Sequence, residues 1–250
     1  MTETLSTLDN LVWFGASVTG SQHQKDKRPN EDAWMGDRHK LGTFIVVSDG
    51  LGSKPNARQG AKTACIAVKQ ALRHWLAISS KDTNHDVSSK LLLRLIHVLW
   101  SLNILPNAET DSAATCLFAT VSASGKLAIA QLGDGLAVLR EPDGSLHSIT
   151  SERSGFSNQT TGLGIAQSTK DWQILTRPSL EKGSAIFLAT DGIADDLQRN
   201  RLSDFIAMLL SDFGTLPPRQ RWQALSHELR EFPVPNHLDD KTLAILWRQS

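Results

Sequence analysis

The sequence predicts an α+β protein in which β-hairpins form sheets and helices pack against them. Short apolar runs rich in β-branched residues are typical of strands, and several end at turn signals such as Ser124-Gly125 and Pro142-Asp143-Gly144. Two longer segments have the helical period instead. Because the helices separate groups of strands and do not alternate strictly with single strands, a doubly wound parallel sheet is not expected.

The predicted strands are spread over the whole chain. They are Leu11–Phe14, Phe44–Val47, Thr115–Val121, Leu127–Gln131, Ala137–Leu139, Trp172–Thr176, Ala185–Ala189 and Leu243–Trp247. The turn signals between the central runs predict that the middle of the chain is a meander of antiparallel hairpins.

An apolar face that repeats at steps of three and four residues predicts the helices. The segments with this face are Ala61–Leu76, Leu91–Leu102, Leu202–Leu210 and Arg219–Leu229. The first two are expected to form a helical hairpin, with the polar stretch Ser79–Ser89 as its loop. Ser151–Thr169 is rich in Ser, Gly, Thr and Gln and is interpreted as a long surface loop, a kind of segment that is often functional.

The chain has 250 residues, of which 40% are apolar, enough for one domain over residues 1–250 with its core at about 11–248. Lysine plus arginine equals aspartate plus glutamate at 26 each, so no overall charge attracts nucleic acid or an anionic membrane. No secretion signal or long apolar stretch occurs, so a cytoplasmic monomer is expected. Cys65 and Cys116 lie in apolar stretches and are expected to be buried and free.

Three apolar strands run into an Asp that is followed at once by Gly, at Asp49-Gly50, Asp134-Gly135 and Asp191-Gly192. One such dipeptide alone is usually just a good turn. Three are harder to dismiss, because carboxylates held at the ends of buried strands repel one another unless a cation lies between them. The acidic pairs Glu31-Asp32 and Asp239-Asp240 add to the count.

This donor set favours Mg²⁺ or Mn²⁺, which prefer oxygen ligands, whereas zinc would need His or Cys at ligand spacing, and no HxxxH or CxxC pattern occurs. Carboxylates holding two such ions are suited to activating water and to screening a phosphoryl group during in-line attack. The sequence has no G-x-S-x-G elbow and no cysteine in a phosphate loop, so there is no covalent nucleophile to nominate. The residues therefore predict metal-assisted phosphoester hydrolysis.

In this order, the motifs resemble those of the metal-dependent serine/threonine protein phosphatases of the protein phosphatase 2C type, in a bacterial-like branch. The matching blocks span residues about 16 to 247 and are Asn30-Glu31-Asp32-Ala33, Val47-Ser48-Asp49-Gly50-Leu51-Gly52-Ser53 with Gly60-Ala61, Ala114-Thr115, Gly133-Asp134-Gly135, Ala189-Thr190-Asp191-Gly192-Ile193 and Asp239-Asp240-Lys241-Thr242. Each block is weak alone, and the ordered set is specific.

The resemblance implies a four-layer α-β-β-α sandwich, two antiparallel β-sheets flanked by antiparallel helices, with a two-metal site at one end. It also implies Mn²⁺ or Mg²⁺ as cofactor, two ions and a weaker third. The implied metal residues are Glu31, Asp49, Gly50, Asp134, Asp191 and Asp239. The implied nucleophile is a water that bridges the two ions.

By position in the family motifs, Asp49 would bridge both ions and the Gly50 carbonyl would help to hold one of them. Asp191 and Asp239 would hold the other ion, and Asp134 would recruit the third. Glu31 resembles a ligand that acts through water, with Asp32 as its partner. The candidate catalytic residues are Asp49, Asp191 and Asp32.

The chain departs from the family pattern at residues that would contact the phosphate. Lys27 stands where the family usually has an Arg, and lysine lacks the bidentate fork, although Arg28 is adjacent. A bacterial branch has a histidine at the position of His23, which either shares phosphate binding or is an ordinary surface residue. Gly135 replaces a serine, so a hydroxyl is lost. Asp240 stands where Asn is commoner, and it either tightens metal binding or is solvated.

The expected substrate is phosphoserine or phosphothreonine on a protein, opposing a Ser/Thr kinase in signalling. Two alternatives stay open: a pseudophosphatase that acts as a regulatory binding module, and a hydrolase of small phosphoesters. The first would have lost metal carboxylates, and Asp49, Asp191 and Asp239 are present. The metal centre alone does not dictate a protein substrate.

Overall fold

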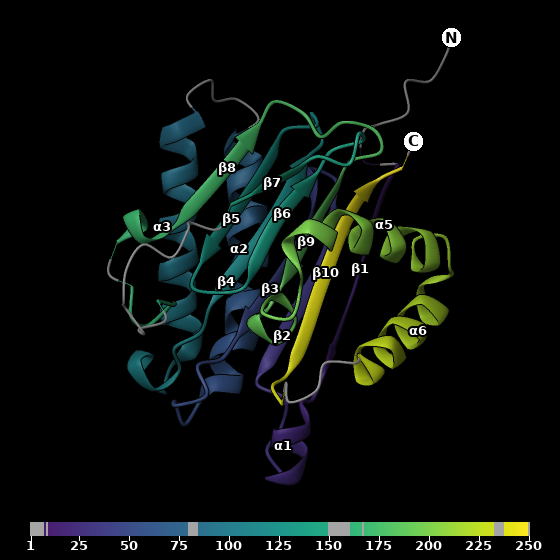
Figure 1. Ribbon diagram of the computed structural model, residues 1–250. Helices are drawn as coiled ribbons and strands as arrows, with labels where there is room; N and C mark the ends of the chain where they lie inside the picture. The colour runs from purple at the N-terminus through teal and green to yellow at the C-terminus, as the bar shows by residue number, and fades with distance from the viewer. Residues whose placement is uncertain are drawn as a thin grey trace.

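Two five-stranded antiparallel sheets face each other, and helices cover the outer face of each (Figure 1). The computed structural model describes residues 8, 10–79, 85–149, 161–166, 168–232 and 238–249. The predicted α+β class and the four-layer α-β-β-α sandwich are both confirmed.

The first sheet has the strand order β2-β3-β4-β5-β8, and α2 and α3 pack against it. Its elements are β2 (Asp32–His39), β3 (Gly42–Asp49), β4 (Cys116–Ser122), β5 (Leu127–Leu132), β8 (Gln173–Arg177), α2 (Ala57–Ser79) and α3 (His85–Ile104). The second sheet has the order β1-β10-β9-β6-β7, and α5 and α6 cover it. Its elements are β1 (Leu11–Val18), β6 (Leu136–Arg140), β7 (Leu146–Ser148), β9 (Ala185–Ala189), β10 (Lys241–Arg248), α5 (Leu202–Phe213) and α6 (Pro218–Glu231).

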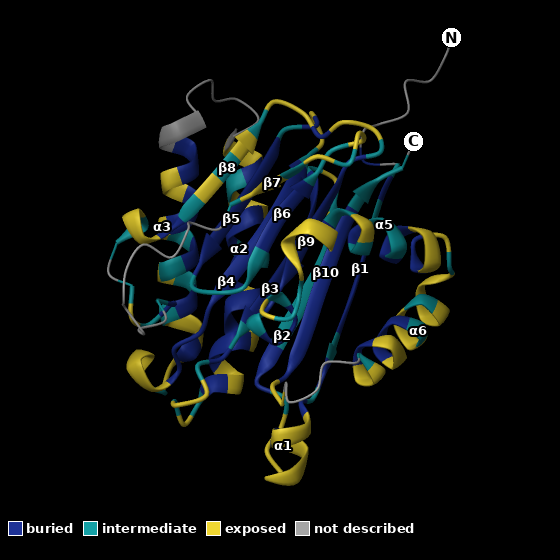
Figure 2. Cartoon of the chain, in the orientation of Figure 1, coloured by how far each residue is buried: buried dark blue, intermediate teal, exposed yellow. Residues whose placement is uncertain are grey.

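Alternation of side chains along the central strands divides the core into three layers. Along β3, Ile45 and Val47 point between the sheets, whereas Phe44 and Val46 pack against α2 and α3. β3 is buried over nearly its whole length, as are β5 and β9 (Figure 2). The rigid ends of these strands provide fixed positions for the residues that follow them.

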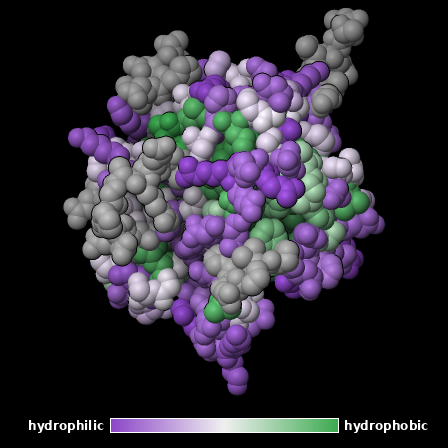
Figure 3. All heavy atoms as spheres, viewed as in Figure 1, coloured by the Kyte–Doolittle hydropathy of each residue, from purple (hydrophilic) through white to green (hydrophobic). Residues whose placement is uncertain are grey.

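Short helices connect the strands at the end of the sandwich where the Asp-Gly dipeptides lie. They are α1 (Ser21–Lys25) and α4 (Asp191–Ala194). Elsewhere in the chain, single 3₁₀ turns occur at Glu109–Asp111, Thr169–Asp171 and Arg199–Arg201. α1 projects from this end, at the bottom of the view, and its surface is hydrophilic (Figure 3).

The predicted strands and helices are all present, and most are extended at one or both ends. Ala185–Ala189 matches its strand, and Thr115–Val121 and Trp172–Thr176 are each shifted by one residue. The expected loop at 79–89 was wrong in part, because α3 begins at His85, and residues 80–84 lie outside the described residues. The expected central hairpins were confirmed in part, because β4 pairs with β5 and β6 pairs with β7, both antiparallel, but the four strands do not form one meander. β5 and β6 belong to different sheets, so the chain crosses between sheets at Gly133-Asp134-Gly135, where both glycines have a positive φ.

The interpretation of Ser151–Thr169 as a surface loop was wrong at Gly162 and Leu163, which are buried, whereas Ile165 is exposed. Leu163 is fully buried and its backbone exchanges hydrogen bonds with Ala114 at 2.8 and 3.2 Å. Residues 151–160 and 167 lie outside the described residues. Both cysteines are buried and free, as expected, and no described helix has the length and apolarity needed to cross a membrane.

Trp100 joins α3 to α2, because its buried indole nitrogen donates to the Gly60 carbonyl at 3.1 Å. Trp100→Phe removes this hydrogen bond and leaves a cavity, so it is expected to lower the free energy of unfolding by about 2 kcal/mol or more. Trp222, which is half exposed, is the matched control, and Trp222→Phe should change it by less than about 0.5 kcal/mol. Urea denaturation measures both. Equal effects would contradict this role of Trp100.

Candidate metal centre

The three Asp-Gly dipeptides meet at one end of the sandwich. Asp49 is the last residue of β3 in one sheet, Asp191 follows β9 in the other sheet, and Asp134 lies in the crossover between β5 and β6. One carboxylate oxygen from each of the three lies within 4.8 Å of the others. The half-buried side chains therefore form a compact acidic cluster, built by residues that are 142 positions apart in the chain (191 − 49).

Strand pairing explains why these residues converge. β6 pairs with β9 so that Leu136 lies opposite Ala189, which places Asp134 beside Asp191. On the other side, the Asp49 amide donates to Thr115 Oγ1 at 2.8 Å, and this contact fixes the end of β3. Gly192 is required by packing, because a Cβ there would lie 1.8 Å from the Asp240 carbonyl oxygen.

Asp32 stands behind the cluster and is almost fully buried. It lies directly opposite Asp49 in the β2–β3 ladder, and Thr190 Oγ1 donates to its carboxylate at 2.8 Å. Burial raises the pKa of Asp32 to about 7, although the hydroxyls of Thr242 and Thr190 counteract this. Asp32 therefore gives Asp49 a neighbouring carboxyl group with which a proton can be shared.

The electrostatics of the cluster resist the presence of several negative charges. Burial, and then repulsion from Asp32 and Asp191, raise the pKa of Asp49 well above its usual range. Burial, and then repulsion from Asp134 and Asp239, raise the pKa of Asp191 to about 6. A bound cation would remove this repulsion, so the arrangement is suited to holding one.

Asp239, the remaining sequence-predicted acidic ligand, lies in the turn before β10 and is exposed. Its charge acts on both Asp49 and Asp191, so it faces the same site. It lies outside the group of three mutually close carboxylates, which in the described part of the chain comprises Asp49, Asp134 and Asp191.

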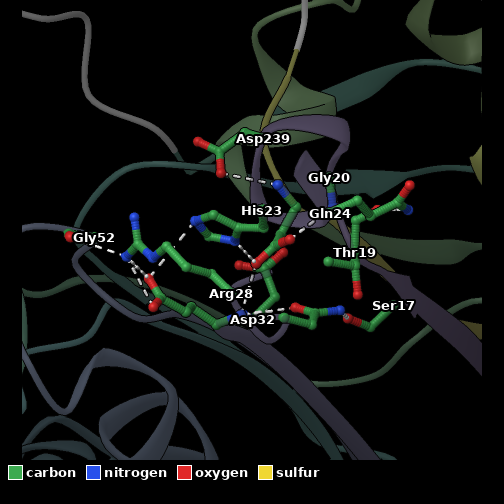
Figure 4. Close-up of polar contacts among 12 residues, drawn as sticks. Ser17, Thr19, Gly20, His23, Gln24, Arg28, Asp32, Gly52 and Asp239 are labelled. Atoms are coloured by element: carbon green, nitrogen blue, oxygen red, sulfur yellow. Dashed lines mark hydrogen bonds and ion pairs between the residues drawn. The ribbon is translucent and has the colours of Figure 1, made fainter. Parts of the chain in front are cut away.

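Glu31 and Arg28 form a pair at the edge of the site. Arg28 Nη2 donates to both Glu31 carboxylate oxygens at 2.9 Å and lies 3.3 Å from the Gly52 carbonyl oxygen (Figure 4). Lys27 is exposed and has a positive φ of 54°. The structure thus brings Arg28, and not Lys27, into contact with the acidic residues of the site.

His23 is only 8% exposed, so it is not an ordinary surface residue, which was one of the two interpretations of its position. Its Nδ1 lies 2.9 Å from Asp240 Oδ2, and its Nε2 lies 3.9 Å from Glu31 Oε2. Asp240 is 2% exposed, so its carboxylate is not solvated, which was one of the two alternatives for this residue.

Comparison with known proteins identifies the family of this chain. A profile described as "Protein phosphatase 2C" matches residues 19–232. The chain belongs to the protein phosphatase 2C family. The matched range contains the three clustered carboxylates as well as Glu31 and Asp32, and it ends before Asp239 and Asp240. No curated protein sequence matches the chain.

Solved structures, two of them of serine/threonine phosphatases, share the fold at low sequence identity. A serine/threonine phosphatase of S. agalactiae is 15% identical with a TM-score of 0.67, over 96% of this chain and all of that one. The Mycobacterium tuberculosis serine/threonine phosphatase PstP/Ppp is 16% identical with a TM-score of 0.61, over 96% and 99%. RsbX, determined in complex with magnesium, is 16% identical with a TM-score of 0.58, over 94% of each chain. The protein phosphatase 2C fold therefore covers nearly the whole chain.

Sequence reasoning did not foresee the contacts of three residues at this acidic site. Thr190 and Thr115 tie Asp32 and Asp49 in place, and both stand inside the quoted motifs, so their position beside a candidate ligand was a usable signal. Asp240 was noticed as a departure from the family pattern, but its contacts were not foreseeable.

Proposed function

We propose that this chain is a metal-dependent protein serine/threonine phosphatase that hydrolyses phosphoserine and phosphothreonine. One observation carries the proposal: Asp49, Asp134 and Asp191 converge from three strand ends to within 4.8 Å in a family of phosphatases. We further propose that residues 1–250 form one catalytic domain with its core at about 11–248.

The donor set fits Mg²⁺ or Mn²⁺. Its members are carboxylates, which hard cations prefer, and the described residues bring no histidine or cysteine into the cluster of three. Two ions and a weaker third are proposed. The residues that would hold them are Glu31, Asp49, the Gly50 carbonyl, Asp134, Asp191 and Asp239. When bound, such ions supply an acidified water and screen the charge of a phosphoryl group.

The chain's own residues would keep the site in a reactive arrangement. Asp32 lies against Asp49 and takes a hydrogen bond from Thr190, so it can orient the Asp49 carboxylate and accept a proton from its neighbourhood. Asp191 is fixed by a hydrogen bond of 2.7 Å from the Gly192 amide. Asp49, Asp191 and Asp32 are thus the proposed catalytic residues.

Arg28 is the best-placed of the candidate phosphate-binding residues Lys27, Arg28 and His23. Its guanidinium contacts Glu31 through a single nitrogen, Nη2, and its side chain is 41% exposed. The rest of the guanidinium can therefore approach a phosphate, which arginine binds through its planar fork. Lys27 would supply charge only, and His23 would act by holding Asp240, whose carboxylate lies 2.9 Å from its Nδ1.

The proposed substrate is a phosphoprotein opposed by a Ser/Thr kinase, and the proposed context is cytoplasmic signalling by a monomer. The family and the retained carboxylates favour catalysis over a regulatory binding module. A small phosphoester is the competing substrate class, because it needs the same metal centre.

Metal removal tests the activity. The protein is expected to hydrolyse p-nitrophenyl phosphate and phosphothreonine peptides in millimolar Mn²⁺, to lose at least about 99% of this rate in excess EDTA, and to regain it with added Mn²⁺. A panel of small phosphoesters serves as the second arm. Absence of turnover on every substrate in Mn²⁺ and in Mg²⁺ would contradict the enzyme, and turnover confined to small phosphoesters would contradict the protein substrate.

A further inference from the structure

The segment between β1 and β2, residues 19–31, carries Arg28 and Glu31 but has almost no core of its own. From residue 20 to residue 31, Gly20, His23 and Glu31 are buried and the others are exposed or half-buried. α1 lies in this segment, and His23 is its buried residue. Since little apolar surface fixes the segment, its position must depend on polar contacts.

The carboxylate of Asp240 supplies such contacts from the other end of the chain (Figure 4). The Gly20 amide donates to its Oδ1 at 2.7 Å, and His23 Nδ1 and the Glu31 amide donate to its Oδ2 at 2.9 and 2.6 Å. These three donors stand at the start, the middle and the end of the segment. One buried side chain therefore clamps the whole segment.

Only a carboxylate can satisfy these donors. Both oxygens of an aspartate accept hydrogen bonds, whereas an asparagine offers one accepting oxygen and an NH₂ group that can only donate. In place of Asp240, an asparagine would turn its NH₂ group either toward the Gly20 amide or toward the donors from His23 and Glu31. A buried donor would then face another donor, which is costly.

The adjacent carboxylates of Asp239 and Asp240 thus have different surroundings and different roles. Asp239 is exposed and acts on Asp49 and Asp191, whereas Asp240 is buried under the segment. The backbones are in close contact, because a Cβ at Gly20 would lie 2.2 Å from the Asp239 carbonyl carbon. The clamp is therefore part of the same turn that presents Asp239.

From Asp240 a chain of contacts leads to the guanidinium proposed to bind phosphate. The Asp240 carboxylate holds Glu31 directly, because Oδ2 accepts from the Glu31 amide at 2.6 Å. It also accepts from His23 Nδ1, and His23 Nε2 lies 3.9 Å from Glu31 Oε2, where it attracts that oxygen only when the ring carries both protons. Glu31 in turn holds Arg28, which also reaches the Gly52 carbonyl beside Asp49-Gly50. Displacement of His23 or of the Glu31 backbone would shift Arg28.

We propose that Asp240 is a positioning residue, which clamps residues 20–31 and, through His23 and Glu31, sets the place of Arg28 beside the metal centre. The proposal gives Asp240, in the last acidic block of the sequence, a role distinct from the metal binding proposed for Asp239. The kinetic consequence of this role rests on the proposed function. The hydrogen bonds of Asp240 do not depend on that function.

Asp240→Asn tests this role against Asp239→Asn, the same change one residue earlier. At saturating Mn²⁺, Asp240→Asn is expected to raise KM for p-nitrophenyl phosphate about 10-fold and to change kcat less than about threefold. Asp239→Asn is expected instead to weaken apparent Mn²⁺ affinity about 10-fold. An unchanged KM in Asp240→Asn, or a loss of Mn²⁺ affinity equal to that of Asp239→Asn, would overturn the proposal.

A second measurement does not depend on activity. The ¹⁵N resonances of the His23 ring report which nitrogen carries the proton, and we expect protonated Nδ1 in the wild type and in Asp239→Asn, and its loss in Asp240→Asn. If the wild type hydrolyses nothing, the proposed function fails, while this readout still decides the clamp. The same Nδ1 state in all three proteins would refute it.

If Asp240→Asn does not fold, the clamp can be opened from His23. An asparagine amide at position 23 places a donor near the position of Nδ1, whereas a glutamine amide reaches the position of Nε2. His23→Gln should therefore raise KM about 10-fold and His23→Asn much less. Equal increases in both variants would show that His23 does not act through Asp240.

Discussion

Asp49→Asn is expected to lower kcat/KM for Mn²⁺-dependent hydrolysis at least about 100-fold while it raises the thermal stability of the metal-free protein. The loss follows from the place of Asp49, which among the described residues is the carboxylate that lies near Asp32, Asp134 and Asp191 together. The gain follows because burial, and then repulsion from Asp32 and Asp191, raise the pKa of Asp49, so that its charge opposes folding when no cation is bound.

Two measurements on the same variant separate these effects: steady-state kinetics in saturating Mn²⁺, and thermal denaturation in EDTA at pH 8. Asp212→Asn, at an exposed position on α5, is the matched control and should change neither quantity. An Asp49→Asn enzyme that keeps a tenth or more of wild-type kcat/KM would show that Asp49 is not a central ligand. A lower melting temperature in EDTA would show that its carboxylate stabilises the metal-free fold.

Opposite effects on activity and stability are expected because both sheets contribute to the site. β3 and β9 are buried strands of different sheets, and each delivers an Asp at its end. The strong apolar packing of these strands holds the carboxylates close despite their repulsion. The packing of the core thus keeps mutually repelling carboxylates close together, and this arrangement favours the binding of cations.

Much of the fold could be predicted from the sequence, because the buried strands are continuous apolar runs and α2 and α3 have a clear apolar period. β2 was missed, since Asp37 and Arg38 and a glycine interrupt a strand whose residues are mostly half-buried. α1 was missed because five polar residues carry no period. The change of sheet between β5 and β6 has no local signal except the two flanking glycines.

Part of the candidate site could likewise be predicted from the sequence, and part of it could not. Asp49, Asp134 and Asp191 could be singled out because each follows a strand and precedes a glycine, and the structure brings them together. The role of Asp240 was beyond the sequence, since its partners Gly20, His23 and Glu31 lie 209 to 220 positions away. The choice of Arg28 over Lys27 depends likewise on a contact with Glu31 that composition does not specify.

Without metal, the protein is expected to become more stable as the pH falls from 8 to 5.5, the reverse of ordinary acid denaturation. Burial raises the pKa of Asp32 to about 7 and that of Asp191 to about 6, whereas both titrate near 3.8 when unfolded. Between these values the folded state binds protons that the unfolded state releases. The stabilising contribution of these two protonated carboxyl groups is therefore fully present below the unfolded pKa and is lost as the pH rises through 6 and 7.

Thermal denaturation in EDTA and in saturating Mn²⁺ across this range measures the effect. For Asp32 alone, which is almost fully buried, the change is on the order of 2 kcal/mol, or about 5 °C in melting temperature. Saturating Mn²⁺ should flatten or reverse the dependence, because cations bind the deprotonated carboxylates. Asp32→Asn should make the dependence in EDTA shallower and leave the smaller contribution of Asp191. If the EDTA-treated wild type instead loses stability on acidification as the Mn²⁺ form does, the raised pKa values of the cluster are not a property of the metal-free fold.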